Sequence, residues 1–305
     1  YHVAIFHLFT HAFFKALLFL GSGSVIHAFK DEQDIRNMGG VRKKLPYTYI
    51  LMLIGTLALT GFPFLSGFYS KDAIIEFAYL RNSSLGNYAA AIGIFTAFLT
   101  SIYSWRLFFK TFHGSYNNKT IPINETHESP IIMLAPLFLL GIGALLAGYF
   151  FKETFIGHHR NDFWQTSIFF LNEIKHDTIP LWFLLLTPVL VTVSIPISFY
   201  YFVSNTKILE EFKNTNLPLH NFLINKWYVD ELYEIIFIIP LKKLGSFFWK
   251  QGDLGIIDRF GPDGISKLIK KISHKASLFQ TGFIYDYAFA MLIGLSILLT
   301  YLILN

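Results

Sequence analysis

Apolar residues are concentrated in six long runs along this chain. The runs occupy residues 3–29, 46–62, 88–109, 131–151, 181–203 and 283–304. Most of them are close to the roughly 20 residues with which a helix crosses a bilayer. The pattern predicts an all-α, polytopic membrane helix bundle with six spans.

The second run belongs to a longer region, 46–80, that cannot form one straight span. As a single helix it would be about 52 Å long at 1.5 Å per residue, which exceeds the hydrocarbon core of a bilayer. Pro63 lacks a backbone donor and clashes one turn back, while Gly61 and Gly67 relax the chain on either side. We therefore expect a discontinuous membrane helix that is broken around Pro63.

The segment 204–281 has a different pattern, because charged residues and glycines divide its apolar pieces into lengths too short to span. The dividing residues include Lys242, Lys243, Gly252, Gly255, Gly261 and Pro262. If residues 225–279 are wholly helical, they extend about 80 Å. Such a helix would lie on or beside the membrane rather than cross it.

The second part of this segment is amphipathic. The apolar helical face carries Ile265, Leu268, Ile269, Ile272, Ala276 and Phe279. The opposite face carries Lys267, Lys270, Lys271, His274 and Lys275. The chain is therefore expected to have three parts: a bundle at 1–203, a lateral amphipathic segment at 204–281, and an anchoring span at 282–305.

Composition supports a membrane protein, since only 15% of residues are charged against about 25% in soluble domains. The formal net charge is +5, but the basic residues fall between the spans, so a nucleic-acid partner is not expected. Loop 30–45 carries five Lys and Arg, and segment 204–281 carries eleven more. The positive-inside rule places both on the cytoplasmic or matrix side.

The chain has no cysteine, which excludes a disulfide framework, a cysteine nucleophile and cysteine-ligated iron–sulfur clusters. No glycine-rich phosphate motif is present either, so we expect no cofactor on this chain. It begins at Tyr1 and enters an apolar helix directly, without the basic region and cleavage site of a signal peptide. We expect a longer protein of which an N-terminal part is absent.

Three titratable residues recur every four positions inside the first apolar run: His7, His11 and Lys15. Each step of four residues turns a helix by only about 40° further, so the three share one stripe about 12 Å long. A lysine near mid-span costs about 2.5 to 3.5 kcal/mol on insertion scales and usually faces an interior or hydrated path. Histidine titrates close to neutral pH. The spacing predicts a proton relay.

Two other interpretations of this stripe compete with the relay. In one, Lys15 extends towards the membrane surface and the histidines only hydrogen-bond neighbouring helices. In the other, His7 and His11 hold zinc, but a metalloprotease motif needs Glu directly after the first histidine, and Leu8 stands there. We therefore expect no metal site.

The second group of candidate residues, Lys71 and Asp72, follows the predicted break. Discontinuous helices free backbone groups at membrane depth, and transporters use them for ion sites. Lys71 is a candidate second proton station, with Asp72 acting on it electrostatically. The competing interpretation is a charged helix end, since Glu76 follows one turn later.

Three stretches carry a resemblance to a known family: HLFTHAFFKALLFLGSGSVIHAF, DIRNMGGVRKKLP and LTGFPFLSGFYSKDAIIE. They resemble subunit L of bacterial NADH:quinone oxidoreductase (respiratory complex I), which corresponds to mitochondrial subunit 5. The match is dense over residues 1–76. Residues 88–203 agree mainly in the number of spans, and the lateral segment and final span agree in architecture.

The resemblance implies a proton-pumping, antiporter-like subunit that is driven by quinone reduction elsewhere in an enzyme complex. The family's central relay is carried onto His7, His11 and Lys15, and its exit-side lysine and neighbouring acid onto Lys71 and Asp72. NADH, FMN, iron–sulfur clusters and quinone would be bound by other subunits. The lateral segment would contact other membrane subunits, in a bacterial plasma membrane or a mitochondrial inner membrane. The glutamate–lysine pair of the family's first half has no counterpart here.

Two alternatives remain open at this point. One is the large subunit of a multisubunit sodium/proton antiporter, which shares much of the relay without redox coupling. Asp72 after Lys71, together with a lateral segment before a final helix, favours complex I. The other is a structural clamp that carries no protons, although a clamp has no need of a titratable stripe at mid-span.

Overall fold

The computed structural model describes residues 1–119, 121–169 and 179–304, which are mainly helical and contain no strand. They form two compact units, Tyr1–Thr215 and Asn216–Asn305. Each unit has its own internal packing. The expected all-α fold is confirmed.

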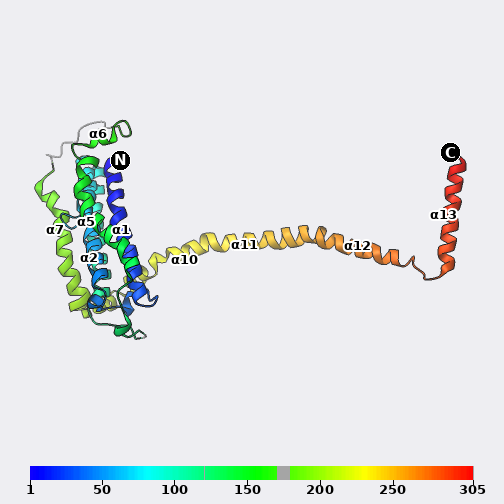
Figure 1. Cartoon of the computed structure of the whole chain (residues 1–305), viewed down its shortest axis with the longest axis horizontal. Coiled ribbons are helices and arrows are strands. Elements are labelled where there is room, and N and C mark those ends of the chain that lie inside the picture. Colours follow the sequence, from blue (N-terminus) through cyan, green and yellow to red (C-terminus); the bar gives the residue numbers. More distant parts are fainter. Residues whose placement is uncertain (120, 170–178, 305) are drawn as a thin grey trace. The chain divides into compact units, whose positions relative to one another are not determined.

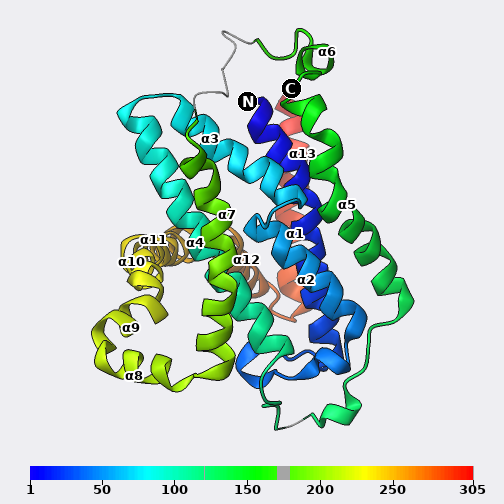
Figure 2. The ribbon, with the colours of Figure 1, turned by 90° about the vertical axis from the view of Figure 1, so that its left-hand side faces the viewer.

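The first unit is a helix bundle. Its main helices are α1 (His2–Ala28), α2 (Pro46–Thr60), α3 (Ala73–Leu80), α4 (Ser84–Phe112), α5 (Ile131–Phe155) and α7 (Leu181–Phe199). Two shorter helices, α6 (Arg160–Trp164) and α8 (Lys207–Thr215), follow α5 and α7 respectively. Helix α1 packs against α2 and α5, while α4 packs against α7, α3 and α2 (Figure 2).

Five helices in the described part of the chain are long and apolar enough to cross a membrane. They are His2–Ala28, Ser84–Phe112, Ile131–Phe155, Leu181–Ser204 and Ile284–Leu304. The remaining apolar run, 46–62, forms α2. Its 15 residues extend only about 22 Å, less than the roughly 30 Å hydrocarbon core. Helix α2 therefore requires the helical turns after the break to complete a span, as the sequence predicts.

Helix α2 ends in a Schellman motif. Gly61 takes a left-handed conformation, with φ 83°, which glycine adopts without strain. Its N–H donates to the carbonyl of Ala58, and the N–H of Phe62 donates to the carbonyl of Leu57. These two bonds satisfy carbonyls that the helix end would otherwise expose, but the motif leaves the last carbonyl of α2, that of Thr60, free for another donor.

The chain resumes as a π-helical turn, η3 (Phe68–Asp72), which continues into α3. Gly67 opens this second half at a close approach, where any side chain would collide with the carbonyl of Ala58. π-Helical turns inside α-helices frequently occur at functional sites. Here the turn carries both Lys71 and Asp72.

The N-terminus of α2 is capped by a residue 80 positions away in sequence. Glu128 accepts hydrogen bonds from the backbone N–H groups of Tyr47 (2.8 Å) and Thr48 (3.2 Å), and from the hydroxyl of Thr48 (2.6 Å). Ser24 Oγ lies 2.8 Å from Thr48 Oγ1 and 2.6 Å from Ser129 Oγ. The connector between α4 and α5 thus ties the start of α2 to the end of α1.

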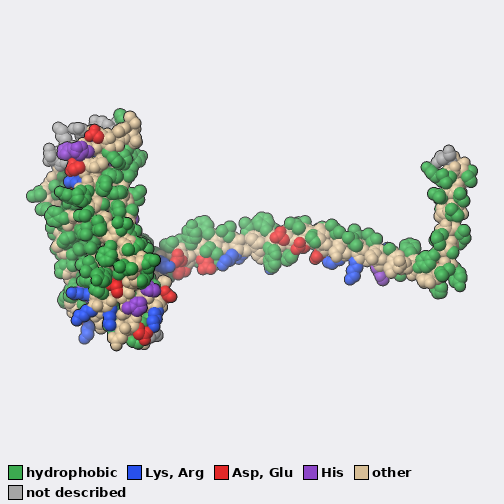
Figure 3. Space-filling view, in the orientation of Figure 1, with side chains coloured by type: hydrophobic (Ala, Val, Ile, Leu, Met, Phe, Trp, Pro, Cys, Tyr) green, Lys and Arg blue, Asp and Glu red, His purple; other side chains and the backbone are tan. Residues whose placement is uncertain are grey.

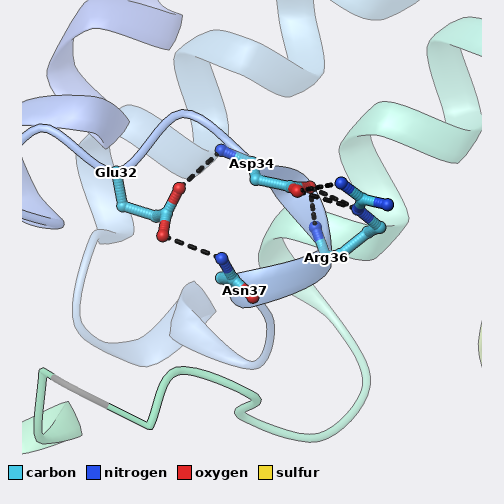
Figure 4. Close-up of polar contacts among 4 residues, drawn as sticks. All are labelled: Glu32, Asp34, Arg36 and Asn37. Atoms are coloured by element: carbon cyan, nitrogen blue, oxygen red, sulfur yellow. Dashed lines mark hydrogen bonds and ion pairs between the residues drawn. The ribbon is translucent and has the colours of Figure 1, made fainter.

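The loop between α1 and α2 is ordered by local polar contacts (Figure 4). Asp34 accepts from the backbone N–H of Arg36 and pairs with its guanidinium, while Glu32 accepts from the backbone of Asp34 and the amide of Asn37. The hydrogen bonds and charge of Arg36 lower the pKa of Asp34 to about 2. Asp34 therefore stays charged down to strongly acidic pH.

The second unit is a run of helices placed end to end (Figure 1). It contains α9 (Leu217–Ile224), α10 (Val229–Tyr233), α11 (Ile239–Phe247), α12 (Pro262–Ser277) and α13 (Ile284–Leu304). Two π-helical stretches, Glu234–Ile238 and Phe248–Asp258, join α10, α11 and α12. Residues 229–260 are continuously helical, and only Gly261 separates them from α12. The predicted long helical segment is present.

Replacing the glycine that ends α2 should destabilise the bundle. In Gly61→Ala the new methyl group meets only ordinary contacts, to Lys71 and Asp72, so the expected cost of about 1 kcal/mol comes from the left-handed backbone. We expect a lower midpoint of thermal unfolding in detergent.

The matched control is Gly23→Ala, which lies inside α1 and whose added methyl would meet nothing within 4 Å. Alanine is the better helix former, so this variant should be at least as stable as the unmodified chain. Equal midpoints for the two variants would contradict the assigned role of Gly61.

Candidate functional site

The predicted stripe lies along α1. The rings of His7 and His11 have centroids 5.6 Å apart, and the edge of Phe14 packs against His11 at 5.3 Å. Lys15 follows His11 by one helical turn and is the middle residue of α1. All three titratable side chains are partly buried. The structure thus places His7, His11 and Lys15 in a row.

Lys15 is too far from either end of α1 to reach the membrane surface. Thirteen residues on each side of it are helical, which corresponds to about 20 Å of helix in both directions. A lysine side chain is much shorter than that distance. The geometry disfavours the interpretation in which Lys15 merely extends to the interface.

A hollow of about 190 Å³ beside Lys15 lies between α1, α2 and α4. Most of its lining is apolar, and the hydroxyls of Ser22 and Thr56 already donate to carbonyls one turn back, those of Leu18 and Met52. Ser104 differs, because its buried Oγ meets no hydrogen-bond partner among the described residues. An unsatisfied buried hydroxyl is a site at which water gains hydrogen bonds.

Hydroxyl groups join the stripe on α1 to the broken helix. Ser70 Oγ lies 3.0 Å from His7 Nδ1 and 2.7 Å from Thr10 Oγ1. Ser70 and Thr10 are fully buried. This junction connects residues that are more than sixty positions apart in sequence, so it exists only in the folded chain.

Lys71 reaches back across the break to the end of α2. Its Nζ donates to the carbonyl oxygen of Thr60 at 3.3 Å, the carbonyl that the Schellman motif leaves free. The C-terminal end of a helix carries partial negative charge, which favours a cation there. The charge of Lys71 also lies within electrostatic range of His7.

Asp72 lines a cavity that Lys71 does not line. It is 7% exposed, and neither carboxylate oxygen meets a hydrogen-bond donor among the described residues. It borders a cavity of about 570 Å³ between the π-helical turn, α3 and the end of α5. The charged and titratable residues lining this cavity are Asp72, Glu76, Lys152, Glu153, His158 and Arg160. A buried carboxylate therefore borders a strongly polar vestibule.

The sequence pattern does not distinguish Thr10 and Ser70 from packing hydroxyls, whereas the structure places both at the junction. The available signal was their position, since Thr10 lies between the two histidines and Ser70 directly precedes Lys71. Ser66, by contrast, does serve packing, because it bonds the backbone of Gly143 and Gly148 on α5.

The loop histidines lie outside the α1 stripe and the junction at Ser70. His158 borders the vestibule, and His159 lies 3.9 Å from Asp162 at the surface. His176 lies outside the described residues. Within residues 1–119, 121–169 and 179–304, no three His, Asp or Glu side chains are grouped as metal ligands.

Two family models match the chain. The model described as the transmembrane domain of NADH:quinone oxidoreductases and Mrp antiporters matches residues 1–104, and that of the NADH dehydrogenase subunit 5 C-terminus matches residues 163–303. The first model alone is common to both classes of transporter. The second model describes only NADH dehydrogenase subunit 5, so its match favours similarity to that subunit over similarity to the antiporters.

Individual relatives agree with this assignment. The chain is 43% identical to NADH-ubiquinone oxidoreductase chain 5 of Phytophthora infestans, over 96% of its own length and 45% of that protein. It is 35% identical to NADH-quinone oxidoreductase subunit L of Rhodobacter capsulatus, over 99% of its own length and 52% of that protein. The chain spans about half the length of the curated relatives it matches.

The five candidate spans of the described residues and the first matched model indicate an antiporter-like membrane protein. Over nearly its whole length the chain is similar to subunit 5 and subunit L of NADH:quinone oxidoreductase, and the two matched models agree with this similarity.

Proposed function

We propose that this chain carries protons across the membrane as part of an NADH:quinone oxidoreductase, along the side chains of its α1 stripe and broken helix. The observation that supports this most strongly is the junction at Ser70. Its hydroxyl contacts His7 and Thr10, and Ser70 directly precedes Lys71. The row of titratable side chains on α1 therefore meets the broken helix at this junction.

Each group has a distinct task in this route. Lys15 receives a proton near mid-span, and His11 and His7 pass it along α1, because an imidazole can accept a proton at one nitrogen and release one from the other. The hydroxyls of Ser70 and Thr10 relay it across the helix interface, since a hydroxyl both donates and accepts. Lys71 then holds the proton beside the end of α2.

Repulsion between neighbouring stations links their protonation states in this proposal. Two protonated rings 5.6 Å apart repel each other by about 3 kcal/mol at an effective dielectric constant of about 20. A proton that arrives at His11 therefore makes a second proton at His7 unfavourable. The same holds between His7 and Lys71, so each arrival favours the next departure.

The vestibule beside Asp72 provides the release side in this proposal. Asp72 lies next to Lys71 in sequence but borders a cavity lined by charged residues. A carboxylate without a hydrogen-bond donor is a ready proton acceptor. Its location between the buried lysine and a polar cavity suits transfer from the protein interior to water.

The driving reaction lies outside this chain in the proposal. NADH, FMN, iron–sulfur clusters and quinone are bound by other subunits of the complex, and this chain contributes no redox group of its own. The lateral segment contacts other membrane subunits. The assembly resides in a bacterial plasma membrane or a mitochondrial inner membrane, with loop 30–45 and segment 204–281 on the cytoplasmic or matrix side.

Removing the mid-span lysine should abolish pumping. We expect Lys15→Ala, at matched assembly in inside-out membrane vesicles, to lower both NADH-driven acidification and coupled NADH oxidation by at least about tenfold, because one missing station breaks the route. Lys110→Ala, at the end of α4 and away from the stripe, is the control and should retain both activities.

Two other outcomes of the same experiment would replace the proposal. If NADH has no effect and Lys15→Ala instead abolishes sodium-driven proton exchange, the chain works as a sodium/proton antiporter. If Lys15→Ala and Lys110→Ala pump alike, the stripe carries no protons and the chain is a structural clamp.

Removing the hydroxyl of Ser70 should slow proton flux as much as removing a titratable side chain of the route. Ser70→Ala removes the group between His7 and Thr10, and losing a buried hydrogen bond of 1 to 3 kcal/mol should slow proton flux by about tenfold. Ser70→Thr retains the hydroxyl and should restore part of the flux.

Ser22→Ala is the matched control for this substitution, because Ser22 Oγ donates to the carbonyl of Leu18 at 2.8 Å within α1 and is distant from the junction. Vesicle acidification should be unchanged in that variant. A flux in Ser70→Ala equal to that in Ser22→Ala would show that the route bypasses Ser70.

A further inference from the structure

The charges of the second unit are distributed unevenly along its helices. From Lys226 to Arg259 the chain has five acidic and five basic residues. From Gly264 to Tyr285 it has four lysines and one histidine and no acidic residue. The balanced stretch includes α10 and α11, whereas the basic stretch is α12 after its first turn, which carries Asp263. Only the basic stretch therefore carries a net positive charge that a negatively charged surface would attract.

Helix α12 separates its basic and apolar side chains onto opposite faces. At roughly 100° per residue, Lys267, Lys270, Lys271, His274 and Lys275 fall within one arc of about 140°. Ile265, Leu268, Ile269, Ile272 and Ala276 fall within an arc centred on the other side. Figure 3 shows the Lys and His side chains along one side of α12 and hydrophobic side chains along the other.

The apolar face of α12 is exposed within the second unit. Ile265, Leu268, Ile269 and Ile272 are each between 54% and 60% exposed. A continuous exposed apolar stripe marks an interaction surface. A helix with such a stripe and a lysine-rich opposite face typically lies in the plane of a membrane interface, with its lysines among the headgroups.

The position of α12 along the chain keeps it near a bilayer surface. Helix α13, a candidate span, begins at Ile284, and α12 ends at Ser277. Seven residue steps reach at most about 24 Å. Tyr285 and Tyr287 stand at the start of α13, as aromatic residues do at membrane interfaces. The last turn of α12 is therefore tethered close to the headgroups.

We propose that α12 is a lipid-binding helix that lies in the membrane interface and binds the phosphates of anionic phospholipids through its lysine face. Four lysines on one face, with Asp263 in the first turn as the single acidic residue of α12, complement a negatively charged surface, and each contributes near such a surface. The stripe of Ile265, Leu268, Ile269 and Ile272 enters the acyl boundary. The charge-balanced stretch of α10 and α11 lacks this complementarity and is left for protein partners. This assignment is independent of the proton route.

Hydrogen–deuterium exchange on the assembled complex tests the assignment. The complex is placed in nanodiscs of phosphatidylcholine, with or without phosphatidylglycerol, and exchange is followed in residues 262–277. We expect exchange to be at least about tenfold slower in the anionic nanodiscs. Replacing the four lysines (Lys267, Lys270, Lys271 and Lys275) by Gln should abolish this difference between the two nanodiscs. Exchange in α11 should not depend on the lipid.

The control variant replaces Lys242, Lys243 and Lys250 by Gln in the charge-balanced stretch, and it should keep the lipid-dependent protection of α12. If the fourfold variant fails to assemble, a salt titration of the unmodified complex serves instead. Screening should then remove the protection given by phosphatidylglycerol. Equal protection of α12 in both nanodiscs, or protection that salt does not change, would overturn the proposal and assign the face to a protein partner.

Discussion

The structure depends on the absence of hydrogen-bonding solvent at membrane depth, because every polar group placed there has to be satisfied within the protein or by enclosed water. Helix α2 illustrates how strictly this applies. Its start is capped by Glu128, and the Schellman motif at Gly61 satisfies two of its last carbonyls. The carbonyl of Thr60 remains, and Lys71 donates to it. The break in the membrane helix and the position of the lysine therefore have the same physical origin.

The same constraint explains why small residues surround the break. Any side chain at Gly148 of α5 would collide with the backbone of Ser66, and one at Gly143 would collide with the ring of Phe13 on α1. Because the helices approach this closely, the hydroxyl of Ser66 can donate to the carbonyl of Gly143 and accept from the N–H of Gly148. Helix α5 can thus supply the hydrogen bonds that the interrupted backbone lacks. Close packing, and not only the titratable side chains, maintains a broken helix in an apolar medium.

The features that depend on local spacing could be predicted from the sequence. The four-residue recurrence of His7, His11 and Lys15 requires only helical geometry, and the break follows from Gly61 and Pro63. The junction at Ser70 and the cap by Glu128 could not be predicted in the same way. Serine and threonine are common in packed membrane helices, and these contacts join positions 60 to 80 residues apart, for which no periodic pattern exists.

The two ends of the polar route differ in their surroundings. Lys15 borders a mostly apolar hollow in which the hydroxyl of Ser104 is unsatisfied, whereas Asp72 borders a larger cavity lined by charged side chains. A charge is poorly solvated in the first environment and well solvated in the second. The free energy of a proton on the route therefore depends more on the hydration of the hollow than on that of the vestibule. Movements among α1, α2 and α4, which enclose this hollow, therefore change the surroundings of Lys15 directly.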